Sequence, residues 1–207
     1  MTVQAVILDC DGVLADSEWA SAKAWQVALA RLGYQMSEAE FGGFIGTTDW
    51  DLAETFGERL GHDPLGVLAA ANDELRLILA GGLQAFEDAV GLLDRLDGMP
   101  LAVASNSDRW RLEAVLAAAG LDGRFEVSVA ADEVGQPKPA PDVYLRAAEL
   151  LDVLPAGCLV VEDSPTGITA ARAARMQVVA VDRGHFSADQ LEHADRVMSS
   201  LDELQTW

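Results

Sequence analysis

Two aspartates, Asp9 and Asp11, follow a short apolar run near the start of the chain and lead directly into Gly12. A buried strand seldom ends in paired carboxylates unless they bind a cation or take part in chemistry. In an open α/β sheet, ligands bind at the carboxyl ends of the strands. The segment CLVVEDSPTG repeats the pattern far downstream, because an apolar run there ends in Glu162 and Asp163 before a glycine. We therefore expect two strand ends that converge on one metal ion.

Apolar runs of strand length alternate with helical patterns over most of the chain. The strand-like runs lie at residues 5–8, 101–104, 127–130, 159–161 and 178–181, with a weaker one at 196–198. The helical patterns lie at residues 89–96, 108–120, 141–151 and 166–174. Strands and helices that alternate at these lengths indicate right-handed crossovers and a parallel sheet. The sequence therefore predicts an α/β fold with a Rossmann-like parallel sheet at its core.

The pattern changes between Asp16 and Leu83, where strand-like runs vanish and only helical periodicity remains. Apolar residues with helical spacing are Ala22, Trp25, Leu29 and Leu32, then Leu52, Phe56 and Leu60, and then Leu68, Leu75 and Leu79. Ser37 and Glu40 have the spacing of a capping box. The expected domains are an α/β core of residues 1–15 and 84–207 and an inserted all-helical cap of residues 16–83. Because the insertion leaves the sheet directly after the paired aspartates, it can fold over them as a lid.

The chain is strongly acidic, because 14 Lys and Arg residues against 34 Asp and Glu residues give a formal net charge of -20. Such a charge repels nucleic acid and anionic membranes, so we expect a protein that binds neither. No run approaches the length needed to span a bilayer, and the first residues lack the pattern of an export signal. Cys10 and Cys158 have neither disulfide-framework nor metal-site spacing, which suits a reducing compartment. We therefore expect a cytoplasmic protein.

Four segments resemble the four motifs of the haloacid dehalogenase superfamily of phosphotransferases, and they occur in the order of that family. These segments are ILDCDGVLADSE, ASNS around Ser105, GQPKPAPDVY around Lys138 and VVEDSPTGI. Any one of them is a weak signal, whereas four in register are specific. Within the superfamily the chain is most similar to the helical-cap branch, which includes β-phosphoglucomutase and small sugar-phosphate or phosphogluconate phosphatases.

The resemblance implies a role for each acidic residue. By the match to the first motif, Asp9 is the nucleophile that becomes an aspartyl-phosphate. Asp11 protonates the leaving alkoxide and then activates water for the second half-reaction. The implied metal is Mg²⁺, with Asp9, the backbone carbonyl of Asp11, Asp163 and Glu162 as ligands, the last of them directly or through water. Because the net charge opposes an anionic substrate, the cation and one well-placed lysine have to attract it locally.

The two remaining motifs imply residues that hold the transferring phosphoryl group. Ser105 matches the hydroxyl that binds this group, and Asn106 offers a backbone N–H beside it. Lys138 lies between two prolines, which stiffen its segment. The match makes Lys138 the residue that stabilises Asp9 and the charge on the phosphoryl oxygens. Without the other motifs, Ser105 would be an ordinary loop residue and Lys138 a solvated lysine.

Three functions are compatible with these features. The first is a magnesium-dependent phosphatase, acting as a monomer, that hydrolyses a small phosphorylated metabolite. The second is a phosphomutase similar to β-phosphoglucomutase, but Ser21, Asp49 and Ala71 stand where the resemblance places that enzyme's cap histidine, arginine and lysine. The loss of basic groups that would hold a bisphosphate argues against a mutase. The third is a non-catalytic regulatory or binding protein, which could have lost a catalytic carboxylate, whereas this chain retains all of them. We therefore expect the phosphatase.

Overall fold

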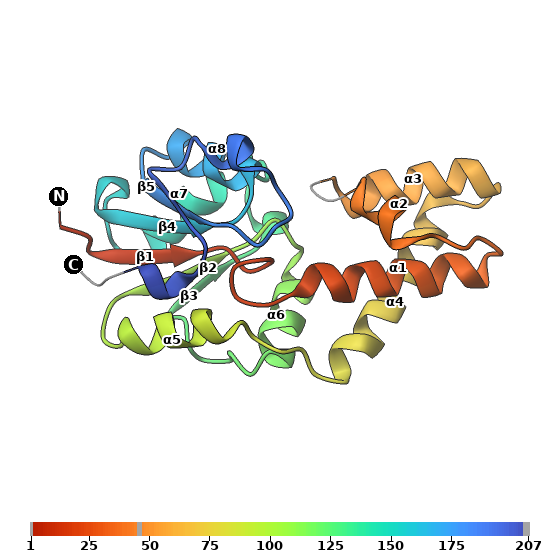
Figure 1. Cartoon of the computed structure of the whole chain (residues 1–207), viewed down its shortest axis with the longest axis horizontal. Helices are drawn as coiled ribbons and strands as arrows, with labels where there is room; N and C mark the ends of the chain where they lie inside the picture. The colour runs from red at the N-terminus through yellow and green to blue at the C-terminus, as the bar shows by residue number, and fades with distance from the viewer. Residues whose placement is uncertain (1, 45–46, 205–207) are drawn as a thin grey trace. The chain divides into compact units, whose positions relative to one another are not determined.

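The computed structural model describes residues 2–44 and 47–204, and the chain divides into two compact units (Figure 1). The first, which we call the α/β unit, contains the residues up to Asp16 together with those from Gln84 onward. The second, the helical unit, is Ser17–Leu83. Asp16 falls in the α/β unit in this division, whereas the expected insertion begins at that residue.

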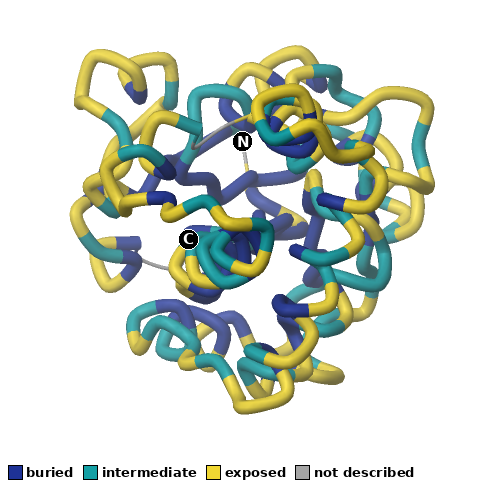
Figure 2. Tube along the Cα trace, turned by 90° about the vertical axis from the view of Figure 1, so that its right-hand side faces the viewer, coloured by how far each residue is buried: buried dark blue, intermediate teal, exposed yellow. Residues whose placement is uncertain are grey.

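In the described part of the α/β unit, six strands form one parallel sheet in the order β3-β2-β1-β4-β5-β6 (Figure 1). The strands are β1 (Ala5–Leu8), β2 (Leu101–Ala104), β3 (Val127–Val129), β4 (Cys158–Glu162), β5 (Gln177–Val181) and β6 (Arg196–Met198). The central strand β1 and its neighbours β2 and β4 are buried along their whole length (Figure 2). The predicted parallel α/β sheet is therefore confirmed. Strands β4 and β5 extend beyond the expected apolar runs because Glu162 and Gln177, although polar, pair within the sheet.

Helices cover both faces of the sheet, with α7 and α8 on one face and α5 and α6 on the other (Figure 1). The helical segments of this unit are α5 (Glu87–Arg95), α6 (Arg109–Ala118), α7 (Asp142–Leu150), α8 (Pro165–Ala173) and α9 (Ala188–Leu191), with 3-10 turns η1 (Ala131–Glu133), η2 (Pro155–Gly157) and η3 (Leu201–Glu203). Two helix ends follow the sequence signals closely. Asp108 is the N-cap residue of α6, and Gly120 beyond its end has a φ of 68°, the left-handed conformation that glycine adopts readily.

The helical unit contains α1 (Ser17–Arg31), α2 (Glu38–Gly42), α3 (Asp49–Leu60) and α4 (Pro64–Ala80). Its interior is an apolar cluster built largely from the residues with helical spacing, among them Trp25, Leu29 and Phe56. The indole N–H of Trp25 also donates a hydrogen bond to Asp49 Oδ1 at 3.0 Å, which fastens α1 to the start of α3. In the described part of the chain, none of the helices has the length and apolar character that crossing a bilayer requires.

The capping box expected at Ser37 and Glu40 forms only in part. Ser37 Oγ accepts a hydrogen bond from the Glu40 backbone N–H at 3.2 Å, as an N-cap residue does. The carboxylate of Glu40 instead accepts from the Tyr34 hydroxyl at 2.6 Å and from Arg59 at 2.8 Å. A reciprocal box is present at the start of α3, where Thr48 is the N-cap. Tertiary partners therefore outcompeted the local bond at Glu40.

Candidate functional site

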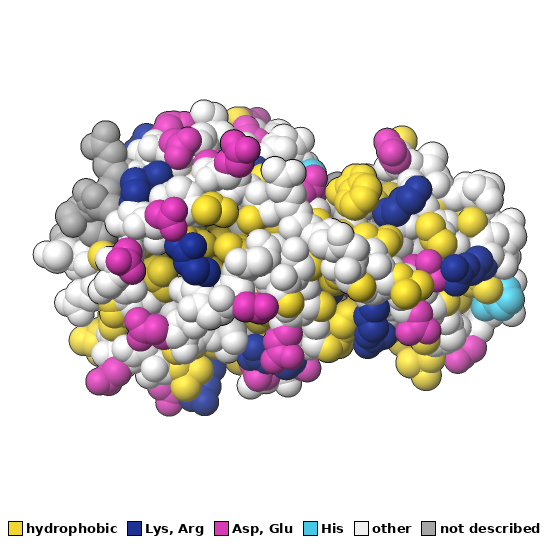
Figure 3. Space-filling model, turned by 90° about the horizontal axis from the view of Figure 1, so that it is seen from below, with side chains coloured by type: hydrophobic (Ala, Val, Ile, Leu, Met, Phe, Trp, Pro, Cys, Tyr) yellow, Lys and Arg dark blue, Asp and Glu magenta, His cyan; other side chains and the backbone are white. Residues whose placement is uncertain are grey.

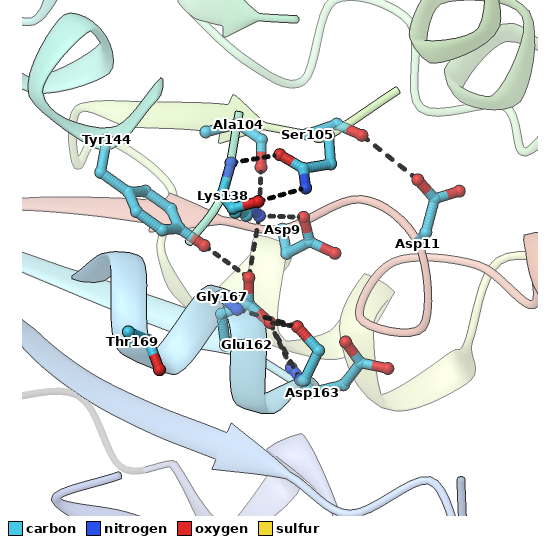
Figure 4. A network of polar contacts seen from close by, with 12 residues as sticks. Asp9, Asp11, Ala104, Ser105, Lys138, Tyr144, Glu162, Asp163, Gly167 and Thr169 are labelled. Carbon is cyan, nitrogen blue, oxygen red and sulfur yellow. Dashed lines mark hydrogen bonds and ion pairs between the residues drawn. The ribbon is translucent and has the colours of Figure 1, made fainter. Parts of the chain in front are cut away.

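Three neighbouring strands of the sheet end beside one another, and each end carries a residue that the sequence singled out (Figure 4). Asp9 follows β1, Ser105 follows β2, and Glu162 is the last residue of β4. All three side chains are buried. Because β1 lies between β2 and β4, the parallel register brings these residues to the same edge of the sheet. This carboxyl edge is where open α/β sheets bind ligands.

The ammonium group of Lys138 lies at the centre of these strand ends. Its Nζ donates to Oδ1 of Asp9, to Oε1 of Glu162 at 2.8 Å and to the backbone carbonyl of Ala104 at 3.0 Å. The Lys138 side chain is only 3% exposed, so these protein oxygens replace the water around a surface lysine. The structure thus places a buried cation directly against the expected nucleophile.

Asn106 holds the segment that carries Lys138. Its side-chain Oδ1 accepts from the Lys138 backbone N–H at 2.7 Å, and its Nδ2 donates to the Lys138 carbonyl at 3.1 Å. This reciprocal pair joins the loop after β2 to the loop before α7. The sequence indicated only a backbone N–H at Asn106, whereas the structure adds this contact made by its side chain.

The carboxylate of Asp11 points toward the loop after β2 (Figure 4). Its Oδ2 accepts from Ser105 Oγ at 3.2 Å and from Ser107 Oγ at 3.0 Å. The backbone N–H of Ser107 also donates to Ser105 Oγ at 3.0 Å, which fixes the direction of that hydroxyl. Sequence reasoning did not assign a role to Ser107, although it ends the ASNS segment and lies two residues after Ser105.

Carboxylate oxygens of Asp9, Glu162 and Asp163 all lie within 4.8 Å of one another, and the three residues are buried. Gly12 makes room for this cluster. A Cβ on Gly12 would lie 2.0 Å from Asp163 Oδ2, and its φ of 76° is itself unfavourable for other residues. The acidic pair at the end of β1 therefore needs the glycine that follows it, because Asp163 occupies the space of a side chain.

The Glu162 carboxylate accepts hydrogen bonds at both oxygens. Oε1 accepts from the Tyr144 hydroxyl at 2.6 Å in addition to Lys138, and Oε2 accepts from the backbone N–H groups of Asp163 and Ser164 at 3.0 Å each. The Ser164 hydroxyl donates to the same Oε2 at 2.9 Å. Tyr144 ends the GQPKPAPDVY segment, but nothing in the sequence indicated that it reaches the acidic end of β4.

Burial and charge act against each other in this site. Burial raises the pKa of Asp9 well above its ordinary value, the charges of Glu162 and Asp11 raise it further, and Lys138 lowers it only in part. Burial alone would lower the pKa of Lys138, but the carboxylates of Asp9 and Glu162 raise it well above its ordinary value. The lysine is therefore held as a cation. A further positive charge beside Asp9 would favour its ionised form.

Arg183, in the loop after β5, binds the backbone of the two residues that follow Asp11. Its Nε donates to the Gly12 carbonyl at 3.1 Å and its Nη2 to the Val13 carbonyl at 3.3 Å. Its two terminal nitrogens also donate to the two carboxylate oxygens of Asp88, each at 2.9 Å. The guanidinium lies 4.0 Å from the centroid of the Phe86 ring. No sequence pattern indicated this anchor, because its members are far apart in the chain.

The surface offers no comparable concentration of positive charge on the face seen in Figure 3, where acidic side chains are interspersed with Lys and Arg. This agrees with the strongly negative net charge of the chain. At the strand ends themselves, the Lys138 ammonium supplies positive charge beside Asp9 and Glu162.

Comparison with known proteins gives the family. The model of the haloacid dehalogenase-like hydrolases matches residues 3–175. Protein CbbY of Rhodobacter capsulatus is 34% identical, over 100% of this chain and 97% of its own length. Fructose-1-phosphate phosphatase YqaB of Escherichia coli is 34% identical over 85% of this chain and 95% of its own length.

A solved structure shows that the likeness extends to the whole fold. CbbY from Rhodobacter sphaeroides in complex with phosphate superposes with a TM-score of 0.85 at 26% identity, and the match covers 98% of this chain and 96% of that one. The family model, the identities over nearly full length and the shared fold agree with the four motifs read from the sequence. The chain therefore belongs to the haloacid dehalogenase-like hydrolases.

Proposed function

We propose that the protein is a magnesium-dependent phosphatase that hydrolyses a small phosphorylated metabolite, of the sugar-phosphate or phosphogluconate type, through an aspartyl-phosphate intermediate. The observation that carries this proposal is the position of Asp9. Its carboxylate lies at the end of the central strand, with the Lys138 ammonium on one oxygen and two further acidic residues beside it. A nucleophile flanked by a fixed cation and a cluster of carboxylates suits attack on a phosphate monoester.

The donor set fits Mg²⁺. This ion prefers a few carboxylate oxygens together with phosphate oxygen and retained waters. Asp9, Asp163 and the Asp11 carbonyl would hold it, with Glu162 directly or through water as a fourth partner. When bound, the ion supplies positive charge that offsets the repulsion between Asp9 and the phosphate. The raised pKa of Asp9 supports this assignment, because the protein groups alone do not compensate the buried negative charge.

The protein residues would act in two steps. An oxygen of Asp9 attacks phosphorus and the bond to the leaving alkoxide breaks, while Asp11 gives that alkoxide its proton. Asp11, now ionised, takes a proton from water, which attacks the aspartyl-phosphate, restores the Asp9 carboxylate and releases inorganic phosphate. Ser105 and Lys138 hold the phosphoryl oxygens in both steps. The Ser105 and Ser107 hydroxyls support this role, because their hydrogen bonds to Oδ2 fix the direction of the Asp11 carboxylate.

The helical unit favours a phosphatase over a mutase. Ser21 is buried and its hydroxyl donates to the Ser17 carbonyl at 3.0 Å. Asp49 accepts from Trp25, and Ala71 belongs to the apolar cluster of the unit. These three positions therefore supply no basic group for a second phosphate. A non-catalytic binding protein on the same fold remains the alternative that loss of turnover would reveal.

A substrate screen tests the proposal. We expect magnesium-dependent release of inorganic phosphate from one or more sugar phosphates or from phosphogluconate. Phosphorus NMR with β-glucose 1-phosphate and glucose 1,6-bisphosphate in one tube separates the alternatives. We expect any glucose 6-phosphate that forms to be matched by released inorganic phosphate. Rapid formation of glucose 6-phosphate without released phosphate would identify a mutase. Absence of turnover on every phosphate in the presence of Mg²⁺ would favour the binding protein.

The setting of the enzyme is also part of the proposal. Both cysteines are free and buried, which suits a reducing cytoplasm. We propose a cytoplasmic monomer whose partner is the small phosphorylated substrate, with no nucleic acid or membrane involved. Sedimentation equilibrium at several concentrations tests the monomer, and a mass that rises toward twice 22.0 kDa would exclude it.

A further inference from the structure

Arg183 is a largely buried arginine that the proposed reaction does not use. Its side chain is 13% exposed, and that of its ion-pair partner Asp88 is 12% exposed. The guanidinium donates to the Gly12 carbonyl through Nε and to the Val13 carbonyl through Nη2. Nη1 and Nη2 each donate to one carboxylate oxygen of Asp88. One side chain in the loop after β5 therefore joins the turn after Asp11 to the first turn of α5.

These contacts leave the guanidinium little capacity to bind an anionic ligand. An arginine offers five N–H donors, and the hydrogen bonds to Gly12, Val13 and Asp88 use four of them. The centroid of the Phe86 ring lies 4.0 Å from the guanidinium carbon, so the ring packs against one face of the group. Arg183 therefore holds protein groups in place, in contrast to an arginine that receives a phosphate.

The turn after Asp11 closes on itself through its backbone. The Gly12 N–H donates to the Ala15 carbonyl at 3.1 Å, and Asp11 and Ala15 form a β-bridge. The carbonyls of Gly12 and Val13 accept instead from Arg183. The backbone that carries the Asp11 carboxylate is therefore fixed by a side chain from a distant part of the chain.

The segment before α5 is tied to the same turn. The Phe86 N–H donates to the Leu14 carbonyl at 2.9 Å, and Ala85 forms an antiparallel bridge with Ala15. The Phe86 ring also packs on the Arg183 guanidinium at the distance of a cation–π contact. In the sequence, the turn and this segment flank the helical unit on its two sides. Arg183 thus contacts both of them.

Asp88 gives the guanidinium a fixed support. It lies in the first turn of α5, and its Oδ2 also accepts from the Leu201 N–H at 2.9 Å and from Ser200 Oγ at 3.3 Å. A bidentate pair between a carboxylate and an arginine sets the direction of the guanidinium as well as its position. We call Arg183, Asp88 and Phe86 the Arg183 clasp.

We propose that Arg183 is a positioning residue, which holds the turn after Asp11 and thereby the direction of the Asp11 carboxylate. Ser105 and Ser107 bind that carboxylate from the loop after β2, and the clasp fixes its backbone from the loop after β5. This inference rests on the proposed function, in which Asp11 carries the proton in both steps. Proton transfer depends on the placement of the donor, so loss of the clasp should lower kcat and leave the phosphoryl group held by Ser105 and Lys138.

Hydrogen exchange of backbone amides tests the clasp without turnover. In Arg183→Ala we expect exchange at the Gly12 and Phe86 N–H groups to accelerate about tenfold, because both take part in the hydrogen bonds of the turn that the guanidinium holds. The Val6 N–H in the central strand β1 reports global destabilisation, and the acceleration is measured relative to it. Acceleration at Gly12 and Phe86 that does not exceed the change at Val6 would overturn the proposal.

Arg172→Ala is the matched control for this measurement. Arg172 Nη1 donates to the His193 carbonyl at 2.8 Å and to Asp195 Oδ1 at 3.2 Å, so this arginine also joins a backbone carbonyl to a carboxylate within the α/β unit. We expect Arg172→Ala to leave exchange in the turn after Asp11 at the parent rate. An acceleration as large as that in Arg183→Ala would mean that the turn responds to the loss of any such arginine, and it would contradict the clasp.

Steady-state kinetics on an aryl phosphate test the positioning role. We expect Arg183→Ala to lower kcat about tenfold, with KM within about twofold of the parent, and Arg172→Ala to keep the parent kcat. Guanidinium chloride, at concentrations too low to unfold the protein, should restore part of the kcat of Arg183→Ala, whereas equal sodium chloride should not. A raised KM with an unchanged kcat would show that Arg183 binds substrate, and an equal response to the two salts would contradict the positioning role.

A second variant keeps the proposal testable if Arg183→Ala loses its fold by circular dichroism. Asp88→Asn retains the arginine and removes the charge that orients it, so we expect faster exchange at Gly12 and Phe86 and a kcat lowered about threefold. Parent values for both quantities would overturn the proposal. If the parent protein hydrolyses no phosphate at all, the proposed function fails, whereas hydrogen exchange still decides whether Arg183 fixes the turn.

Discussion

The two units of the chain have interiors of different kinds. The helical unit packs aromatic and aliphatic side chains such as Trp25 and Phe56 around an apolar centre. The α/β unit is equally apolar between sheet and helices, but at the carboxyl edge of the sheet it buries Asp9, Lys138 and Glu162. Buried charges stabilise a fold poorly even when they are paired. The difference indicates that the apolar interior holds the structure and that the charged edge is retained for chemistry.

The helical unit has one informative exception among its described residues. Glu74 on α4 is buried and forms an ion pair with Arg31 on α1. The Arg31 side chain is 66% exposed, so water reaches one end of this pair. At the strand ends both partners of each pair are buried, and backbone N–H groups and hydroxyls complete the hydrogen bonds. The Arg31–Glu74 pair links α1 to α4 at a site that water reaches. The pairs of Lys138 with Asp9 and Glu162 belong instead to a buried network that holds the charges in fixed directions.

The largest effect should follow a change at the charged edge. Asp11→Asn removes the proposed proton carrier but keeps the shape and the hydrogen-bonding oxygen, so we expect kcat to fall about a thousandfold. The free energy of unfolding should change by less than about 1 kcal/mol. Assays of released inorganic phosphate measure kcat, and urea unfolding measures the free energy of unfolding. Asp97→Asn, at an exposed position, is the control. If Asp11→Asn lost its activity because it unfolded, the charged edge would be needed for stability, and the contrast between the two units would be wrong.

A change in the apolar interior should have the opposite signature. Phe56→Ala empties the centre of the helical unit, where the ring also contacts Tyr34 and Phe44, so we expect a loss of about 3–4 kcal/mol in stability. Leu65→Ala, on an exposed face of α4, should change stability by less than about 0.5 kcal/mol. Urea unfolding monitored by circular dichroism gives both values. Similar values for the two variants would mean that the cluster is not the centre that holds the unit.

Removal of Asp163 should affect metal binding more than folding. Asp163→Asn takes away one buried charge beside Asp9, so the metal-free variant should be at least as stable as the metal-free parent, while stabilisation by added Mg²⁺ shrinks by about 1–2 kcal/mol. Thermal melts with and without Mg²⁺ provide the comparison. Asp182→Asn is the control, because Asp182 follows β5 at the same edge but is exposed. Unchanged stabilisation by Mg²⁺ in Asp163→Asn would exclude this residue from the site.

The smallest effect should come from the anchor of the loop at the end of β1. Burial would raise the pKa of Asp88, but hydrogen bonds from Arg183 and the Leu201 N–H outweigh it and lower the pKa below its ordinary 3.8. A carboxylate with a depressed folded-state pKa stabilises fully above pH 3.8 and loses that contribution as the pH falls through the lower value. Asp88→Asn should therefore cost about 1 kcal/mol near pH 7 and almost nothing in acid. A cost independent of pH would contradict the ionic role.

The sequence could predict the sheet and the group of residues at its edge because both are encoded locally. Apolar runs define parallel strands, and the carboxyl end of each strand follows from where its run stops. Ser105 and Glu162 could thus be placed together, whereas Lys138 was placed with them only by the resemblance of its segment to the third motif. The structure brings the Lys138 ammonium against Asp9 and Glu162. The contacts of Tyr144 and Arg183 could not be predicted. Arg183 lies 171 residues from Gly12 in the chain, and its partners are set by the packing of loops rather than by any local pattern.

The central claim is that Asp9 accepts the phosphoryl group, and its most direct test is a crystal structure of the protein soaked with beryllium fluoride and Mg²⁺. Beryllium fluoride forms a bond to a carboxylate that has the geometry of an acyl phosphate. The account predicts that beryllium is bound to a side-chain oxygen of Asp9, with Lys138 and Ser105 on its fluorides. Beryllium on another residue, or a site that stays free of it while Mg²⁺ is bound, would contradict the assignment of Asp9 as the nucleophile.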